Sequence, residues 1–382
     1  MIYMDNAATS WPKPKAVYQE MINCMKYYGA NPGRSGHRMS IMASEKIYEC
    51  RENIARLFNI PNPLCVSFTG NTTEAINMGI KGCLKKGDHV IITGMEHNSV
   101  LRPIKKMEMT GDISCTIVDA DQEGFVSVKD TVKSIQNNTK LIVVTHASNV
   151  CGTVNPVHEI GKIARERNIL FMVDAAQTAG ILPIDVQSMN IDILAFPGHK
   201  GLLGPQGTGG LYVREGLVLD TIKEGGTGSN SEEPYQPDFV PDRYESGTLN
   251  TPGIAGLNEG VKYILKNGQE EIRQYEKELT LYLLEGLYSI KKVKLYGTSD
   301  IEKRVGVISL NIDGKDSVEV CNILDEQYQI ASRGGLHCSY LAHKTLQTLE
   351  TGTLRLSIGC FNTKKEIDKV LHAINHMNGF IS

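Results

Sequence analysis

The sequence lacks the features that would place it among membrane, secreted or nucleic-acid-binding proteins. Its 382 residues contain one tryptophan and carry a formal net charge of -3, so neither nucleic acid nor an anionic membrane is expected as a partner. No apolar run approaches the length of a membrane span. Residues 1–5 show no basic end followed by an apolar core, so no signal peptide is expected. These absences predict a cytoplasmic globular protein.

Cysteine pairs at metal-binding or redox spacing are also absent. The nine cysteines are scattered and none forms a C-x-x-C pair, which argues against a zinc ribbon or a thioredoxin-type motif. Most are expected to be small buried residues in a reducing compartment. A Walker phosphate loop is excluded because Asp88 follows the glycines of 82–87 where a lysine is needed, and the glycines of 204–209 do not have Rossmann spacing.

What the sequence does contain is an alternation of strands and helices. Apolar runs of strand length occur at 64–68, 89–93, 114–118, 141–145, 169–173, 191–195 and 209–213. Helical spacing occurs between them at about 97–107, 127–136 and 156–167, after an earlier helix at 38–58. This α/β alternation predicts a mostly parallel sheet covered on both faces, with ligands bound beyond the carboxyl ends of its strands.

A second, smaller α/β region follows this alternation. A helix-rich stretch at about 253–290 precedes strands predicted at 305–312 and 354–358 and helices predicted at 316–326 and 364–377. We expect the N-terminal segment to pack on this smaller region.

A lysine within a glycine-rich stretch, 196–207, is the centre of the predicted site. Lys200 follows a predicted strand on a loop that a ligand can approach closely, as a Schiff-base lysine requires. Alone, Lys200 would more simply be a solvated surface residue. Asp174 ends the apolar strand 171–174, and although it could be a helix cap, a carboxylate there can also pair with a protonated pyridine nitrogen. An aspartate and a Schiff-base lysine together are typical of a pyridoxal phosphate (PLP) site.

Asp174-x-x-Gln177 followed by Gly198-His199-Lys200 resembles the class V aminotransferase family of fold-type I PLP enzymes. Within it, the chain resembles the cysteine desulfurases, with SufS-like and selenocysteine lyase-like features, from Asp5-Asn6-Ala7-Ala8-Thr9 to Arg355-Leu356-Ser357. The resemblance implies a fold-type I PLP-dependent transferase. Its large domain, 16–258, would have a mostly parallel seven-stranded sheet. Residues 1–15 and 259–382 would form the smaller α/β domain that carries the active-site cysteine loop.

The cofactor phosphate is expected at the start of a helix. Thr72 and Thr73 open a predicted helix, where free amides and the helix dipole favour an anion, although an ordinary N-cap threonine is the simpler alternative. The resemblance implies that both threonines and His199 contact the phosphate. Many relatives have serine or threonine two residues before that histidine, but this chain has Pro197, which offers neither hydroxyl nor N–H.

Three further residues are expected around the cofactor ring. His97 follows a strand and starts a helix, and the resemblance implies that it stacks on PLP and handles protons, where a hydrogen-bonded loop histidine is the alternative. The same resemblance implies that Asn149 and Gln177 hydrogen-bond near the ring oxygen, and that Asn149 also lies beside the substrate. Turn formation is the alternative for both amides.

The resemblance implies a role in substrate binding for one residue and a contact with a second copy of the chain for another. Arg355, expected at the start of a strand, would bind the substrate carboxylate, although a structural salt bridge is the alternative. Thr248, in Glu245-Ser246-Gly247-Thr248, would contact the phosphate held by the other subunit. This implies a homodimer with composite active sites.

Cys338 is the cysteine expected to react. It lies in a polar, glycine-rich loop, 332–343, and the neighbouring Arg333, His337 and His343 are expected to favour its thiolate. The segment resembles the short active-site loop of the SufS-like desulfurases. A metal site at His337, Cys338 and His343 is an alternative, but its spacing matches no recognised ligand set.

The sequence thus predicts a PLP-dependent conversion of L-cysteine to L-alanine, with the sulfur held as a persulfide on Cys338 and passed to an acceptor protein. The resemblance links such sulfur mobilisation to iron–sulfur cluster biogenesis, but the residues identify no acceptor or pathway. A selenocysteine lyase, or another C–S lyase or aminotransferase-like enzyme that does not need Cys338, remains an alternative. A non-catalytic scaffold in sulfur transfer is a second one.

Overall fold

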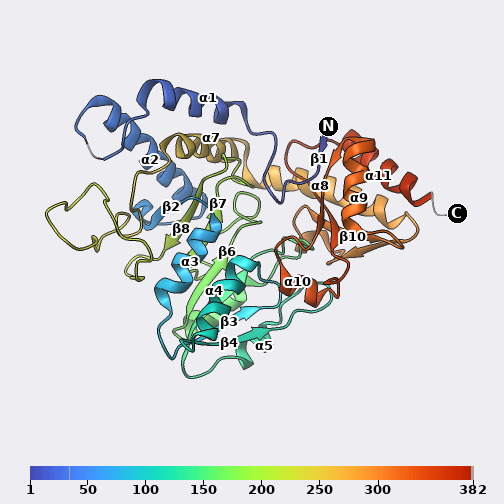
Figure 1. Cartoon of the computed structure of the whole chain (residues 1–382), viewed down its shortest axis with the longest axis horizontal. Helices are drawn as coiled ribbons and strands as arrows, with labels where there is room; N and C mark the ends of the chain where they lie inside the picture. Colours follow the sequence, from blue (N-terminus) through green and yellow to red (C-terminus); the bar gives the residue numbers. More distant parts are fainter. Residues whose placement is uncertain (34, 380–382) are drawn as a thin grey trace.

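The structure is a computed structural model that describes residues 1–33 and 35–379. The last three positions of the predicted small domain lie outside the described residues. Figure 1 shows two parts, a larger one around one sheet and a smaller one on the right that contains both chain termini. The predicted domain boundaries remain a prediction.

The larger part is built on a seven-stranded sheet in the order β2-β8-β7-β6-β5-β3-β4. Every neighbouring pair is parallel except those of β8, which runs antiparallel to β2 and β7. This confirms the predicted mostly parallel sheet. Its strands are β2 (Val66–Thr69), β3 (His89–Thr93), β4 (Ser114–Val118), β5 (Thr139–Thr145), β6 (Leu170–Asp174), β7 (Ile193–Pro197) and β8 (Gly209–Val213).

Helices cover both faces of this sheet (Figure 1). The side chains of β5 alternate between two cores: Ile142 and Val144 belong to one, and Leu141 and Val143 to the other. Because both faces are buried, the strands are continuous apolar runs rather than alternating ones. The first core also contains side chains of α2 (Arg38–Leu57), α6 (Val157–Glu166) and α7 (Thr251–Asn267), and the second those of α3 (Thr72–Cys83) and α4 (Asn98–Met109).

The smaller part has a four-stranded antiparallel sheet in the order β12-β13-β10-β9. Ile2 and Met4 are buried in its core, so the N-terminal segment packs here. Its strands are β9 (Val293–Tyr296), β10 (Val307–Ile312), β12 (Arg333–Gly335) and β13 (Thr353–Ser357), and its helices are α8 (Gln269–Tyr288), α9 (Ser317–Tyr328), α10 (Tyr340–Thr345) and α11 (Lys364–Gly379). A short parallel pair joins β1 (Ile2–Tyr3) to β11 (Ile330–Ala331).

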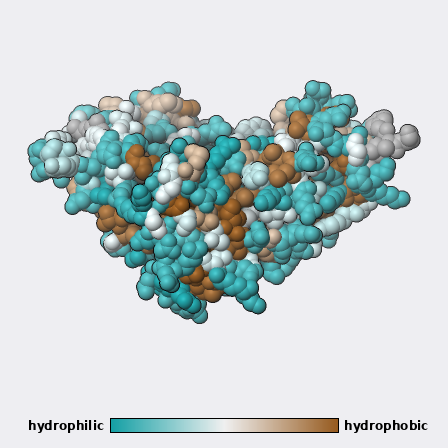
Figure 2. All heavy atoms as spheres, turned by 60° about the horizontal axis from the view of Figure 1, so that its bottom comes forward, coloured by the Kyte–Doolittle hydropathy of each residue, from teal (hydrophilic) through white to brown (hydrophobic). Residues whose placement is uncertain are grey.

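The remaining elements are α1 (Lys15–Asn23), which continues as a π-helical turn at Cys24–Tyr28, α5 (Val128–Lys133), and short 3-10 turns at Pro63–Cys65 and Ile301–Lys303. In the described part of the chain no helix has the length and apolar character needed to cross a bilayer. The face shown in Figure 2 is largely hydrophilic, and its hydrophobic residues form separate small groups.

Two predicted boundaries near the site were wrong. The strand predicted to end at 195 continues to Pro197, which is tolerated because β6 ends opposite Ala195, so no ladder bond to β6 is lost. Arg355, predicted at the start of a strand, lies in the middle of β13 between Arg333 of β12 and Ser309 of β10. The three-residue strand β12 was not predicted, because two of its residues are glycines.

Candidate active site

A cavity of about 210 Å³ lies where the strands of the large sheet end. The residues that line it come from the segments after β2, β3, β5, β6 and β7 and from the smaller part of the molecule. The predicted site residues among them are Thr72, Thr73, His97, Asn149, Asp174, Gln177, His199, Lys200 and Arg355. The structure therefore brings together all of the predicted residues except Cys338 and Thr248, although their individual roles remain a prediction.

Lys200 enters this cavity from a loop that the N-terminal segment holds in place. The Ser10 hydroxyl donates to the carbonyl of Lys200 at 2.9 Å, and the Thr9 hydroxyl donates to the carbonyl of His199 at 3.0 Å. Burial lowers the pKa of Lys200 to about 8, and the positive charge of Arg355 adds to this effect. A substantial fraction of the amine is therefore neutral near physiological pH, as a nucleophilic lysine requires.

Asp174 ends β6 with its side chain almost fully buried. Its Oδ1 accepts a hydrogen bond from the Ala176 N–H at 2.9 Å. Burial raises the pKa of this carboxyl to about 6, which the Ala176 bond and the Lys200 charge only partly oppose. The ionised form would therefore be stabilised by a positively charged group placed in the cavity.

Another part of the cavity lining has the properties of an anion site. Helix α3 begins at Thr72, and the Asn71 side chain caps it by accepting from the Glu74 N–H at 2.9 Å. The first N–H groups of a helix have no partner within the helix, so those of Thr72 and Thr73, which Asn71 does not cap, are available to an anion. His199 Nδ1 is buried and has no hydrogen-bond partner among the described residues. An anion here would satisfy these donors without a hydroxyl at Pro197.

His97 caps helix α4 and is neutral. Its Nδ1 accepts from the Ser99 N–H at 3.1 Å, which assigns the ring proton to Nε2. Burial lowers the pKa of His97 to about 4, and the nearby Lys200 charge contributes to the shift. Its uncharged imidazole is suited to lie against an aromatic ligand in the cavity.

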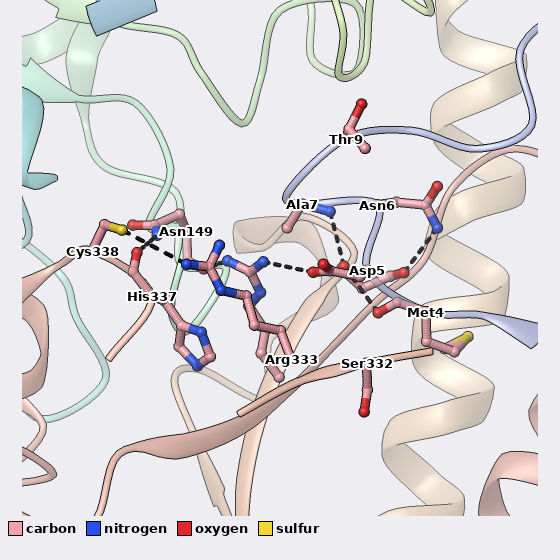
Figure 3. Close-up of polar contacts among 12 residues, drawn as sticks. Met4, Asp5, Asn6, Ala7, Thr9, Asn149, Ser332, Arg333, His337 and Cys338 are labelled. Carbon is pink, nitrogen blue, oxygen red and sulfur yellow. Dashed lines mark hydrogen bonds and ion pairs between the residues drawn. The ribbon is translucent and has the colours of Figure 1, made fainter. Parts of the chain in front are cut away.

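Two arginines face the cavity from neighbouring strands, and the sequence predicted only one of them as a binding residue. Arg333 and Arg355 are cross-strand partners in β12 and β13, and both line the cavity. Arg355 is buried, bound through Nη2 to Asp5 at 2.8 Å and through Nη1 to the Asn149 carbonyl at 3.0 Å. Figure 3 shows Arg333 between Asp5 on one side and Cys338 on the other. The pairing of both arginines depends on β12, which the local sequence does not indicate.

Cys338 is exposed, and Arg333 Nη2 lies 3.7 Å from its sulfur (Figure 3). The predicted contribution of the two histidines was wrong. Burial lowers the pKa of His337 to about 2 and that of His343 to about 4, so both are neutral. Of the three predicted positive neighbours, only Arg333 supplies charge to the thiol. Within residues 1–33 and 35–379, no three histidines, cysteines or carboxylates form a group that could hold a metal ion.

Asn149 and Gln177, which were predicted to contact the cofactor ring, make hydrogen bonds within the protein through their side-chain amides. Asn149 Nδ2 donates to the His337 carbonyl at 2.9 Å, and its Oδ1 accepts from the Ser339 hydroxyl at 2.7 Å. Gln177 Nε2 donates to the Ala7 carbonyl at 3.1 Å. Both residues line the cavity. Their bonds also connect the wall of the cavity to other segments, through Asn149 to the cysteine loop and through Gln177 to the N-terminal segment.

Thr248 lies away from the cavity. It is exposed, and its hydroxyl accepts a weak hydrogen bond from Asn31 at 3.4 Å. In one copy of the chain it is not among the residues that line the site.

Three comparisons with known proteins agree with one another. The model of the family described as aminotransferase class-V matches residues 2–370. A protein of Methanothermobacter thermautotrophicus named probable cysteine desulfurase is 37% identical, over 99% of this chain and 95% of its own length. One of Pyrococcus abyssi with the same name is 35% identical, over 99% and 94%. The solved apo structure of a cysteine desulfurase from Thermococcus onnurineus NA1 matches with a TM-score of 0.94 and 35% identity, over 100% of this chain and 95% of the other.

Proposed function

The chain belongs to the class-V aminotransferase family, whose members use PLP, and from that membership we propose that it is a cysteine desulfurase acting through Cys338. The reaction converts L-cysteine to L-alanine and leaves the sulfur on the enzyme. The observation that carries the proposal is the exposed Cys338 thiol, beside an arginine that lines the same cavity as Lys200.

The residues that line the cavity fit two groups of PLP, the pyridine nitrogen and the phosphate. A protonated pyridine nitrogen would satisfy the buried Asp174 carboxylate, and a phosphate would satisfy His199 Nδ1 and the amides at the start of α3. His97 would lie against the ring, and Lys200 would hold the cofactor covalently. When bound, PLP withdraws electrons from the α-carbon of an amino-acid substrate.

Residues of the chain itself bind the substrate carboxylate and remove the proton. Arg355, together with Arg333, binds the substrate carboxylate, because a guanidinium offers paired donors to two carboxylate oxygens. Lys200, as a neutral amine, would remove the proton from the α-carbon. Asp5 and the Asn149 carbonyl hold Arg355 in a fixed orientation for this contact.

Sulfur transfer is assigned to Cys338. Its thiolate attacks the sulfur of the substrate, so that an S–S bond forms as the substrate C–S bond breaks. The electron pair of the C–S bond stays with the β-carbon, which takes up a proton. The α-carbon regains the proton that Lys200 removed, and the product leaves as L-alanine. The two sulfurs remain on the protein as a persulfide, and no external oxidant or reductant is needed. A thiol acceptor later attacks the outer sulfur.

Supplying the PLP-loaded protein with L-cysteine tests this proposal. We expect alanine to form, with the removed sulfur retained on the protein until a thiol such as dithiothreitol releases it as sulfide. L-selenocysteine assayed in parallel distinguishes a lyase selective for selenium. Pyruvate with free sulfide, or alanine from L-selenocysteine alone, would contradict the proposal.

The lowered pKa of Lys200 predicts an unusual pH dependence for PLP capture by the cofactor-free protein. The neutral amine reacts, so the rate should rise with pH up to about 8 and change little above it. An ordinary lysine would continue to gain neutral amine up to a pKa of about 10.4. Stopped-flow absorbance of PLP binding measures the profile, with Lys200→Arg as the control that captures none. A rate that keeps rising through pH 9 would contradict the assigned pKa.

The surroundings of Cys338 and Thr248 suggest two kinds of partner. Leu336 and Tyr340, on either side of Cys338 in sequence, are 43% and 49% exposed, so an acceptor protein would meet apolar side chains around the persulfide. Thr248 is exposed outside the cavity, which suits a homodimer in which it reaches the phosphate bound by the second copy.

A further inference from the structure

Helix α4 holds the backbone of the cysteine loop through its first residue, Asn98. The Asn98 N–H donates to the Cys338 carbonyl at 2.9 Å, and Asn98 Oδ1 accepts from the Tyr340 N–H at 3.4 Å. The Cys338 carbonyl and the Tyr340 N–H that make these bonds both belong to the main chain. The contact therefore does not depend on which side chains the loop carries.

The loop needs such support because its backbone is strained. His337 and Cys338 have φ angles of 50° and 59°, in the left-handed region that residues with a side chain rarely adopt. Helix α10 also lacks a cap of its own, because its N-cap residue Ser339 makes no side-chain cap bond. Asn98 Oδ1 accepts instead from the first N–H of that helix.

The same short segment of α4 also positions the residue predicted to lie against the cofactor. His97 is the N-cap of α4 and lines the cavity, whereas Asn98 does not line it. The carbonyl of Cys338 is thus one hydrogen bond away from the residue that follows His97. This arrangement ties the position of the nucleophile to that of the cofactor ring.

We propose that Asn98 is a positioning residue for sulfur transfer: it holds the Cys338 backbone in fixed register with His97, so that the thiolate reaches the substrate sulfur. The proposal rests on the proposed desulfurase function. Asn149 also bonds the loop, at the His337 carbonyl and the Ser339 hydroxyl, but it lines the cavity, so its replacement would disturb binding as well. A change at Asn98 would affect the position of the loop without altering a residue that lines the cavity.

Proline at position 98 offers a sharp test. Asn98 is the first helical residue, where proline is well tolerated, and His97 before it is extended with φ -68° and ψ 156°, as a residue preceding proline prefers. Asn98→Pro removes both bonds to the loop, and Asn98→Ala removes only the acceptor for the Tyr340 N–H. Val128→Pro, at the first residue of α5, is the matched control for the effect of such a proline on folding.

We expect kcat for alanine release from L-cysteine to fall about 10- to 100-fold in Asn98→Pro, because a displacement of about 1 Å can cost about 10²-fold, and less in Asn98→Ala. KM, the absorbance of bound PLP and thermal stability should match those of Val128→Pro. Hydrogen exchange of the Tyr340 amide should be faster in both Asn98 variants.

The proposal is overturned if Asn98→Pro keeps the kcat of the wild type, or if Tyr340 exchanges at an unchanged rate in both variants. It is also overturned if the loss appears in KM or in bound PLP rather than in kcat. These outcomes differ from a failure of the proposed function, in which the wild type itself forms no alanine.

Discussion

Replacing Lys200 with alanine is expected to lower alanine release from L-cysteine by about 10³-fold, within the range that removal of a catalytic base produces. The same change removes the only lysine that lines the cavity of the described site, so PLP should wash out on dialysis instead of remaining covalently held. The free energy of unfolding should change little, because the hydrogen bonds that Lys200 makes with Ser10 and Leu203 use its backbone carbonyl rather than its amine.

Lys13 provides the matched comparison for Lys200. Burial lowers its pKa to about 8 as well, but its amine donates to the Ser10 hydroxyl and the His199 carbonyl, both at 2.7 Å, and it does not line the cavity. Borohydride reduction of the PLP-loaded protein followed by peptide mapping should place the cofactor on Lys200 and leave Lys13 unlabelled. Label on Lys13, or full activity of Lys200→Ala, would contradict the assignment.

The second large effect is expected for Cys338→Ala, which should lower alanine release by about 10²-fold or more by removing the nucleophile. Bound PLP should keep its absorbance, because Cys338 is exposed and does not line the cavity. L-cysteine should still bind and perturb that absorbance. The measurement is steady-state alanine release without an added thiol, together with the spectrum during the first turnover.

Cys321→Ala is the control for Cys338→Ala. Cys321 lies in α9, is partly exposed, and bonds the Ser332 carbonyl close to the same loop. Its replacement should leave alanine release near that of the wild type. Equal activity of Cys338→Ala and the wild type would show that the enzyme does not need this thiol and would favour a lyase of another kind.

The sequence alone predicted the part of the fold whose strands are buried on both faces. Continuous apolar runs such as 141–145 and 169–173 have strong β propensity, and β5 and β6 lie within two residues of the predicted bounds. Thr72, His97, Asn149, Asp174 and Lys200 were placed together for the same reason, since parallel strands deliver their carboxyl ends to one edge of the sheet.

The rest depends on contacts distant in the chain. Strands β1 and β12 have two and three residues, too short for any periodic pattern, yet β12 brings Arg333 beside Arg355 and Cys338. The charge state of His337 could not be predicted either, because its burial against Thr353 of β13 comes from tertiary packing. Asn98 shows the same limit, since its partners Cys338 and Tyr340 lie 240 and 242 residues further along the chain.

Mass spectrometry of the Cys338 peptide tests the central claim most directly. The PLP-loaded protein is exposed to L-cysteine without a reducing thiol, alkylated and digested. The peptide is expected to carry one additional sulfur atom, in an amount that matches the alanine formed in the first turnover, and to lose it on treatment with dithiothreitol. An unmodified Cys338 peptide after stoichiometric alanine formation, or the additional sulfur on another cysteine, would contradict the assignment of Cys338 as the sulfur-carrying residue.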